Sequence, residues 1–365
     1  MVITQGKTVR IAKAFLCALA FVICHSSFVI VRAQSVASYS GEFLQLGVGA
    51  RSLAMGGAGV AISEDATAGY WNPAGLSELQ FPMVTGMHES RFDATVKYDY
   101  GAVGIPLDAR TSAGLSILHL GIGDIRDTRN ALVDLNNNGQ LDPDEYLNYN
   151  KVRTFSNYDW VGIISFAKHI DIPESRGVLL PHPVPSWFTW GINAKIVYRR
   201  LDPQTTGTGI GFDIGVRYIK NNLILAAVAE DITTTLLSYT SGTKELVSPT
   251  LKLGAKYKWS YKDDNVHNFT PTVDADFRFE KRVGQLEAGP ISLDLHEGIE
   301  YAYKDIFALR AGYNDMGMWS AGAGIAFSKF HVDYAYLAMN GQDQLGPTHR
   351  ISFSILLDQP KWMRK

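Results

Sequence analysis

A twelve-residue stretch has the residue types and spacing of a calcium-binding loop. It reads Asp134-Leu135-Asn136-Asn137-Asn138-Gly139-Gln140-Leu141-Asp142-Pro143-Asp144-Glu145 and fits D-x-[DN]-x-[DN]-G-x5-E at every specified position. Ca²⁺ takes about six to eight oxygen ligands, which such a loop supplies from alternating positions and a final bidentate glutamate. The predicted metal ligands are the side chains of Asp134, Asn136, Asn138, Asp142 and Glu145 and the backbone carbonyl of Gln140.

The alternative for this loop is a solvated Asn/Asp turn that holds no ion. Gly139 permits the sharp turn that an ion-binding loop needs. Only three of the six predicted ligands are carboxylates, which indicates weak, extracellular-type affinity. Strong amphipathic helices do not flank the loop on both sides, so a sensor that opens a helix pair is not expected. Calcium is expected to order a long loop.

Motifs for catalysis are missing from the sequence. It contains no GxSxG nucleophile elbow, HExxH pair, GxxxxGK[ST] phosphate loop or GxGxxG dinucleotide turn. Eight histidines follow residue 33 without metal-ligand spacing: His88, His119, His169, His182, His267, His296, His331 and His349. We therefore expect a protein that is not an enzyme. With 34 basic and 36 acidic residues, no nucleic-acid partner is expected either.

The first 33 residues have the features of a secretory signal peptide. Lys7, Arg10 and Lys13 precede an apolar run over residues 14–24, and Val31-Arg32-Ala33 fits a cleavage site before Gln34. A retained membrane anchor is the alternative, although polar residues interrupt the run. Both cysteines lie inside this segment, so the mature chain is expected to have no disulfide or thiol chemistry. Cleavage would leave 30 basic and 36 acidic residues, a net charge of −6.

Residues 34–80 are rich in glycine and alanine and are too few to bury a core of their own. Glycines recur through residues 47–59, where they permit tight turns and close backbone approach, and Asn72-Pro73 marks a turn. This segment is expected to pack against something larger.

From about Met83 onward, apolar and polar residues alternate. Residues 190–198 show the pattern, with one apolar face made of Trp190, Ile192, Ala194, Ile196 and Tyr198. Residues 251–259 and 273–280 repeat it, and aromatic residues recur at the ends of the apolar face. A soluble sandwich would turn this face inward, whereas an outer-membrane barrel turns it toward lipid. The length of the segments, the export signal and the aromatic ends favour the barrel.

Fourteen strands are predicted, and an even number places both barrel ends in the periplasm. They cover residues 83–92, 97–106, 111–121, 156–168, 187–200, 208–220, 222–231, 249–261, 268–281, 292–303, 305–313, 317–328, 329–338 and 347–358. The long link 122–155 then lies outside the cell, and the short link at Asn221–Asn222 lies in the periplasm. Links 169–186 and 262–267 are long for periplasmic turns, and Glu297 interrupts an apolar face, so the number of strands could differ by a hairpin.

Three ordered motifs resemble the N-terminal signature of the PorV/PorQ family. They are Gly49-Ala50-Arg51-Ser52-Leu53-Ala54-Met55-Gly56-Gly57-Ala58, then Asp65-Ala66, then Trp71-Asn72-Pro73-Ala74-Gly75-Leu76. The family belongs to the wider group that resembles the long-chain fatty-acid transporter FadL. The resemblance implies a fourteen-stranded outer-membrane barrel with the N-terminal segment folded inside as a plug. It also implies a role in type IX secretion, with a translocon, secreted cargo and surface-attachment proteins as partners.

Charged residues of the plug and the strands have two interpretations. Arg51, Asp65 and Asn72 could line a conduit, but we favour an Arg51–Asp65 pair inside the lumen and a turn fixed by Asn72. Seven strand residues of mixed sign are predicted to form a salt-bridge lining rather than a selectivity filter: Lys195, Arg217, Lys256, Arg278, Asp213, Asp274 and Asp333.

The sequence thus predicts an all-β protein of the outer membrane of a Gram-negative-type bacterium. The expected parts are a signal peptide (1–33), a plug (34–80), a transmembrane barrel in contact with lipid (81–358) with a long outer loop (122–155), and a tail (359–365). The main functional hypothesis is a non-enzymatic accessory of protein export or surface attachment. The alternative is a FadL-like transporter of hydrophobic small molecules, and a secreted soluble β-protein is a third possibility.

Overall fold

The computed structural model describes residues 41–91, 95–136, 138–172, 186–261, 266–279, 285–288, 291–338 and 348–358. The predicted signal peptide, residues 34–40 of the predicted plug and the predicted tail lie outside these ranges, as does most of the links 169–186 and 262–267. None of the described helices is long and apolar enough to cross a membrane.

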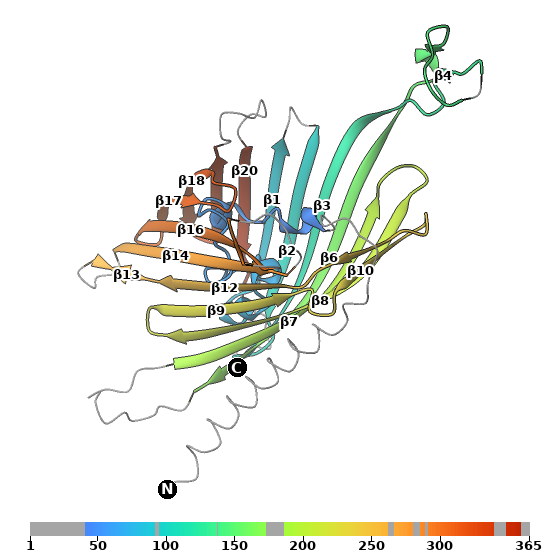
Figure 1. Ribbon diagram of the computed structural model, residues 1–365. Helices are drawn as coiled ribbons and strands as arrows, with labels where there is room; N and C mark the ends of the chain where they lie inside the picture. Colours follow the sequence, from blue (N-terminus) through green and yellow to red (C-terminus); the bar gives the residue numbers. More distant parts are fainter. Residues whose placement is uncertain are drawn as a thin grey trace, which may run out of the picture. The chain divides into compact units, whose positions relative to one another are not determined.

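Fourteen long strands among the described residues form one antiparallel sheet (Figure 1). They are β1 (Met83–Arg91), β2 (Val96–Pro106), β3 (Thr111–Asp127), β6 (Arg153–Asp171), β7 (Ser186–Arg200), β8 (Thr206–Lys220), β9 (Leu223–Glu230), β12 (Thr250–Tyr257), β14 (His267–Arg278), β16 (Ile291–Tyr303), β17 (Phe307–Tyr313), β18 (Trp319–Phe327), β19 (Phe330–Leu337) and β20 (Thr348–Leu356). Each pairs with the next along the chain, and β1 also pairs with β20, from Met83↔Leu356 to Ser90↔His349. The sheet therefore closes into a barrel, as the sequence predicts.

The two rims of the barrel differ in the length of their connections. Tight turns at Asn221, Lys304 and Ser328 adopt positive φ angles of 53°, 53° and 55°, typical of two-residue hairpins. These turns lie at the same rim as Met83 and Leu356, which we call the short-turn rim. The opposite rim, the long-loop rim, carries the long connection between β3 and β6. The predicted contrast between short and long links is confirmed for these connections.

Shorter elements lie between these strands along the chain. They are β4 (Leu132–Val133), β5 (Tyr146–Leu147), η4 (Tyr149–Lys151), β10 (Thr235–Tyr239), β11 (Lys244–Val247), β13 (Trp259–Ser260) and β15 (Leu286–Ala288). Of these, β10, β11, β13 and β15 join the main sheet, whereas β4 and β5 form a separate two-stranded sheet. β3 and β6 pair as far as Asp127↔Arg153, past an irregularity between Ile122 and Ile125. The predicted loop 122–155 is thus a projecting hairpin at its base, and the predicted link 232–248 contains the hairpin β10–β11.

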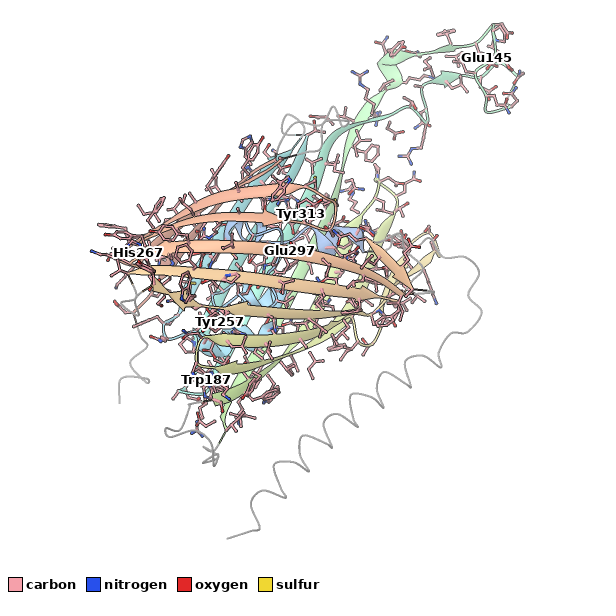
Figure 2. All side chains as sticks on the ribbon, turned by 60° about the vertical axis from the view of Figure 1, so that its left-hand side comes forward. Glu145, Trp187, Tyr257, His267, Glu297 and Tyr313 are labelled. Carbon is pink, nitrogen blue, oxygen red and sulfur yellow. The ribbon has the colours of Figure 1, made fainter. Side chains whose placement is uncertain are left out.

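The outward face of the barrel is apolar and the inward face is polar. Ile192 and Ile196 of β7 are 46% and 60% exposed, whereas Asn193 and Lys195 between them are 2% and 6% exposed. Aromatic and histidine rings gather where β13, β14 and β16 approach the short-turn rim, and Figure 2 shows Tyr257 and His267 at this end. Rings of this kind favour the boundary between lipid and water. The molecule is therefore a transmembrane β-barrel, and the soluble-sandwich alternative is wrong.

The segment before β1 folds into four short helical turns. They are η2 (Glu42–Gln45), α2 (Ala50–Leu53), α3 (Ala68–Trp71) and η3 (Pro73–Glu78). Each is too short to be stable alone, and their buried residues, such as Val48, Met55 and Leu76, gain stability by packing against the wall. This segment packs against the inward face of the wall, and we call it the plug.

We expect the hairpin between β3 and β6 to lie outside the cell, because outer-membrane barrels place long loops there and short turns in the periplasm. Protease added to intact cells should cleave within residues 122–155 and leave the turn at Asn221–Asn222 intact. Mapping the fragments by mass spectrometry tests this. Cleavage at Asn221–Asn222 alone would mean that the orientation is reversed.

Candidate functional site

The contact surface between the plug and the wall is the candidate functional site. η3 packs against β6, β7 and β8, while α2 packs against β18, β19 and β20 on another side of the lumen. Between them, the Gly56 N–H donates to the Ser320 hydroxyl at 2.9 Å. A Cβ atom on Gly56, which has φ +71°, would lie 2.4 Å from the Tyr313 carbonyl oxygen. Only glycine allows the plug backbone to approach the wall this closely.

Aromatic side chains of α3 join it to the earlier residues of the plug. The Trp71 Nε1–H donates to the Val48 carbonyl at 2.9 Å, and the Tyr70 hydroxyl donates to the Leu44 carbonyl at 2.5 Å. Tyr70 also accepts the Gly47 N–H at 3.0 Å. Burial raises the pKa of Tyr70 to about 12, so its hydroxyl remains a donor at neutral pH. These bonds satisfy backbone groups that would otherwise be buried without partners.

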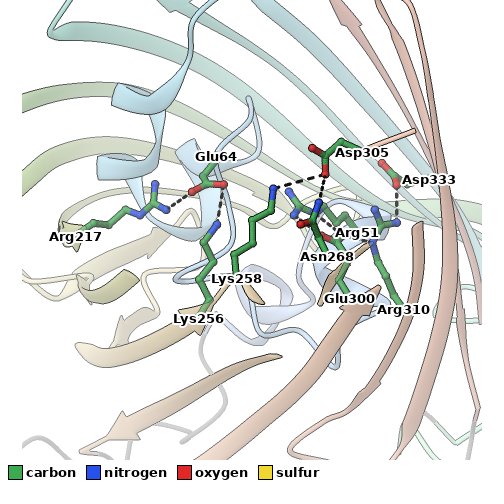
Figure 3. Close-up of polar contacts among 10 residues, drawn as sticks. All are labelled: Arg51, Glu64, Arg217, Lys256, Lys258, Asn268, Glu300, Asp305, Arg310 and Asp333. Atoms are coloured by element: carbon green, nitrogen blue, oxygen red, sulfur yellow. Dashed lines mark hydrogen bonds and ion pairs between the residues drawn. The ribbon is translucent and has the colours of Figure 1, made fainter. Parts of the chain in front are cut away.

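Arg51 joins the plug to the wall through a chain of ion pairs (Figure 3). Its Nε and Nη2 atoms donate to both oxygens of Glu300 at 2.9 and 2.8 Å. Glu300 also accepts Arg310 Nε at 2.7 Å, and Arg310 Nη1 reaches Asp333 at 2.6 Å. Glu300 is thus shared by a plug arginine and a wall arginine. Bidentate pairs of this kind are among the stronger polar contacts in proteins.

Glu64 provides a second attachment. Its two oxygens accept Arg217 Nη2 at 2.9 Å and Lys256 Nζ at 2.8 Å. Burial alone would raise the pKa of Glu64, but Lys256 and Arg217 outweigh it and lower the pKa from 4.5 to about 2. Because this pKa is below its ordinary value, the contact stabilises the docked plug above about pH 4.5 and is lost as the pH falls toward 2.

The predicted salt-bridge lining is confirmed in the described strands. Lys195 Nζ lies 2.7 Å from both Asp213 and Asp231, and Arg278 Nη1 lies 2.8 Å from Asp294. Asp274 accepts the Val60 N–H of the plug at 2.7 Å. Pairing is needed because an isolated charge in a closed lumen would lose its hydration without compensation.

The predicted pairing of Arg51 with Asp65 is wrong. Asp65 accepts the N–H and the hydroxyl of Thr67 at 2.8 and 2.5 Å, which holds its carboxylate in a local turn. Arg51 is left to pair with Glu300 instead. The structural role predicted for Asn72 is confirmed, because its side chain accepts the Ala74 N–H at 3.1 Å and caps η3.

Sequence reasoning missed Glu64, Glu300 and Arg310. Glu300 and Arg310 could have been predicted from the alternation in their strands, because they lie on the inward face whereas Ile299 and Leu309 lie on the outward face. Glu64 could not be predicted in this way, because apolar and polar residues do not alternate regularly in the plug.

Two cavities border the plug. One, of about 20 Å³, is lined by the apolar residues Leu44, Leu118, Val161 and Ile163 together with charged residues that include Lys195 and Asp213. The second, of about 280 Å³, lies beside Arg51, Glu64 and Glu300 and extends to Asp305 and Ile306 at the short-turn rim. The small cavity thus lies beside Leu44 of η2, and the larger one beside Arg51 of α2.

The predicted calcium loop lies at the tip of the projecting hairpin, where β4 pairs with β5 and brings its ends together. Asp134 accepts the N–H groups of Asn138 and Gly139 at 3.2 and 2.7 Å, and Gly139 has φ +73°. The Nδ2 atoms of Asn136 and Asn138 both donate to Asp142, at 2.6 and 2.8 Å.

The carboxylate of Glu145 folds back over this loop and accepts the Leu135 N–H at 2.8 Å. At Gln140, the predicted carbonyl ligand, the backbone N–H donates to the Asn138 side chain at 2.7 Å. Within the described ranges, no three His, Cys, Asp or Glu side chains converge as a metal site. The loop therefore has the sharp turn at Gly139 and the oxygen-bearing side chains that the sequence predicts.

The chain is similar to solved structures that include two toluene transporters and a FadL homologue. The Ralstonia pickettii toluene transporter TbuX has 13% identity and a TM-score of 0.47 over 86% of this chain and 99% of its own. The Pseudomonas putida toluene transporter TodX has 12% identity and a TM-score of 0.42 over 85% and 98%. A Pseudomonas aeruginosa FadL homologue has 10% identity and a TM-score of 0.38 over 82% and 96%. At these values the similarity supports no inference about activity.

No family model matches the sequence, and no curated protein matches it. The class of molecule therefore follows from its own fold and site: a plugged, fourteen-stranded transmembrane β-barrel.

We expect Glu300→Gln to loosen the plug, because it leaves two arginines beside a neutral side chain. Removing one partner of a buried ion pair costs about 3–5 kcal/mol, and the lower end applies here because Arg51 is 29% exposed. The urea midpoint should fall and conductance steps in planar bilayers should become more frequent. Asp358→Asn, which breaks an exposed pair with Lys329, is the control. Unchanged conductance and stability in Glu300→Gln would contradict a latch at this site.

Proposed function

We propose that this chain is a non-enzymatic barrel of the outer membrane that transports hydrophobic small molecules past a movable plug. Two features support the proposal. The plug is attached to the wall by separate polar contacts, from Arg51 to Glu300 of β16 and from Glu64 to Arg217 of β8. Beside η2, the apolar residues Leu118, Val161 and Ile163 line part of a small cavity, and apolar linings suit ligands with little polar surface.

The observation that carries the proposal is the small cavity between Leu44, Leu118, Val161 and Ile163. Its volume of about 20 Å³ holds no more than a water molecule while the plug is docked. Displacement of the η2 region, which supplies Leu44, would join this space to the lumen. A hydrophobic ligand would then replace plug side chains against Leu118, Val161 and Ile163. Lys195 and Asp213 at the edge of the cavity would face any polar group of the ligand.

Filling the cavity should block this binding. Ile163→Trp places a large ring where Ile163 is 4% exposed, so saturable binding of radiolabelled toluene or oleate to the barrel in nanodiscs should weaken at least tenfold. Ile164→Trp is the matched control, because Ile164 is 60% exposed on the outward face. Empty nanodiscs correct for partition into lipid. If wild-type and Ile163→Trp barrels bind equally, or neither binds saturably, the transport proposal fails.

A role in protein export or surface attachment is a second candidate, and the projecting hairpin favours it. β3 and β6 have 17 and 19 residues, well beyond the length that a membrane-spanning strand needs. Their tip carries the predicted calcium loop. Calcium bound by Asp134, Asn136, Asn138, Gln140, Asp142 and Glu145 would order a surface for secreted cargo, a translocon or an attachment protein. The paired loop ends and the turn at Gly139 support this proposal.

Calcium should bind this loop weakly, with a Kd on the order of 10⁻⁴–10⁻³ M, because it offers three carboxylates. Calorimetric titration of the purified barrel should show one site, and Glu145→Ala should abolish it by removing the bidentate ligand. Asp144→Ala is the control, since Asp144 occupies no ligand position. An identical response in wild-type and Glu145→Ala protein would leave an ordinary polar turn.

A further inference from the structure

Polar side chains gather on the outward face of the wall at the long-loop rim, where β20, β1 and β2 lie side by side (Figure 1). Ser90 is the next-to-last residue of β1, and the strand register places Lys97 of β2 and His349 of β20 opposite it, one on each side. All three side chains are exposed. The residues that alternate with them include Glu89 and Arg350, which are buried and pair with each other inside the barrel. The three exposed residues therefore face away from the lumen.

Two histidine rings beside Ser90 are each held through the Nδ1 atom. The Nδ1 atom of His349 lies 2.7 Å from the Tyr334 hydroxyl of β19. His88, two residues before Ser90 on the same face, has its Nδ1 atom 2.6 Å from the Asp99 carboxylate. The bond that one ring nitrogen makes fixes the orientation of the ring and leaves the other nitrogen to meet a ligand. In both histidines that nitrogen is Nε2.

These side chains together offer hydrogen-bond donors for an anion. We call Ser90, Lys97, His88 and His349 the donor cluster. The lysine ammonium is a cation, the serine hydroxyl is a neutral donor, and a protonated imidazole donates from Nε2 as well as from Nδ1. The carboxylate beside the cluster, Asp99, lies between two imidazoles, because its second oxygen is 3.5 Å from Nδ1 of His119 in β3. Its charge is thus directed to the histidine rings.

The donor cluster lies at the level expected for lipid head groups. Its residues in β1, β2 and β20 are close to the strand ends at the long-loop rim, and the exposed Tyr334 and Tyr336 of β19 are beside them. The Tyr336 ring lies 5.6 Å from the His349 ring, and tyrosines favour the boundary between lipid and water. Farther from this rim, the outward residues of β20 are the exposed Ile351 and Phe353. Polar donors thus lie directly above an apolar surface.

The apolar surface next to the donor cluster includes two glycines that pair with each other. Gly86 of β1 and Gly101 of β2 are the next outward pair after the His88–Asp99 pair. A Cβ atom on Gly101 would meet nothing within 4 Å, and one on Gly86 would meet only a carbonyl oxygen at 4.0 Å. Exposed side chains flank the two glycines on the neighbouring strands, Phe353 on β20 and Ile117 on β3. This bare strip leaves room for an acyl chain.

We propose that the donor cluster binds the phosphate of a membrane lipid and that the bare strip at Gly86 and Gly101 holds one of its acyl chains. Lysine, imidazole and hydroxyl donors form charge-assisted hydrogen bonds with phosphate oxygens, and basic clusters at a membrane surface recognise anionic head groups. Because the long-loop rim is expected outside the cell, the ligand is a phosphorylated lipid of the outer leaflet. The site lies on the outside of the wall and is independent of the transport proposal.

Lipid binding to the purified barrel in detergent tests this site, with native mass spectrometry as the measurement. Diphosphoryl lipid A is the probe and should bind saturably. The double variant Lys97→Gln/His349→Gln should weaken its binding at least about tenfold, because both substitutions remove donors to a charged group. Lys220→Gln is the matched control, since Lys220 is an exposed residue at the other rim, at the end of β8. Lipid A without phosphate should bind at least about tenfold more weakly, and inorganic phosphate should not displace the probe.

Gly101→Leu should also weaken lipid A binding, because its side chain would occupy the bare strip. Gly162→Leu is the control, at a glycine of β6 whose added Cβ would likewise meet nothing within 4 Å. All variants should retain heat-modifiable gel migration, and Lys97→Gln alone replaces the double variant if that does not fold. Equal binding of phosphate-free lipid, equal binding by the lysine variants at 97 and 220, equal binding by the two glycine variants, or displacement of the probe by inorganic phosphate would each overturn the proposal.

Discussion

Backbone N–H and C=O groups within a bilayer have no water to bind, so a sheet can cross it only when its edges are paired. In this chain the edges are β1 and β20, which lie more than two hundred residues apart and pair along eight register positions. Closure fixes which side chains face lipid and which face the lumen, because alternate residues of a strand point to opposite faces. The apolar exterior and the charged interior both follow from it.

An interior filled with charges needs counter-charges, and the wall supplies only part of them. Lys195 and Arg278 find carboxylates on neighbouring strands, but Arg217 and Lys256 depend on Glu64 of the plug. The plug is thus an electrostatic component of the barrel as well as an obstruction. It contacts the charged wall at two separate places, at Glu64 and at Arg51.

The wall is not uniform around its circumference. β3 and β6 rise into a hairpin that carries a candidate calcium loop, whereas β17 has only seven residues. Near the end of this short strand, Gly56 of the plug lies against the inside of the wall and Glu297 faces outward. Among the fourteen strands, the longest are thus those of the β3–β6 hairpin and the shortest is β17.

The sequence alone determined the strands and which face of the wall each residue takes. Apolar and polar residues alternate along a strand that has lipid on one side, and this alternation can be read from neighbouring positions. It indicated the closed barrel and the plug through strand number, glycine content and a resemblance, and it located the polar lining. The partner of Arg51 was decided by tertiary structure, since Asp65 was held by Thr67 and Glu300 lay within reach only after β16 joined the wall. The extension of β3 and β6 past residue 121 was likewise set by cross-strand pairing. Local patterns specify which face a residue takes, whereas closure of the sheet decides which residues meet across the lumen.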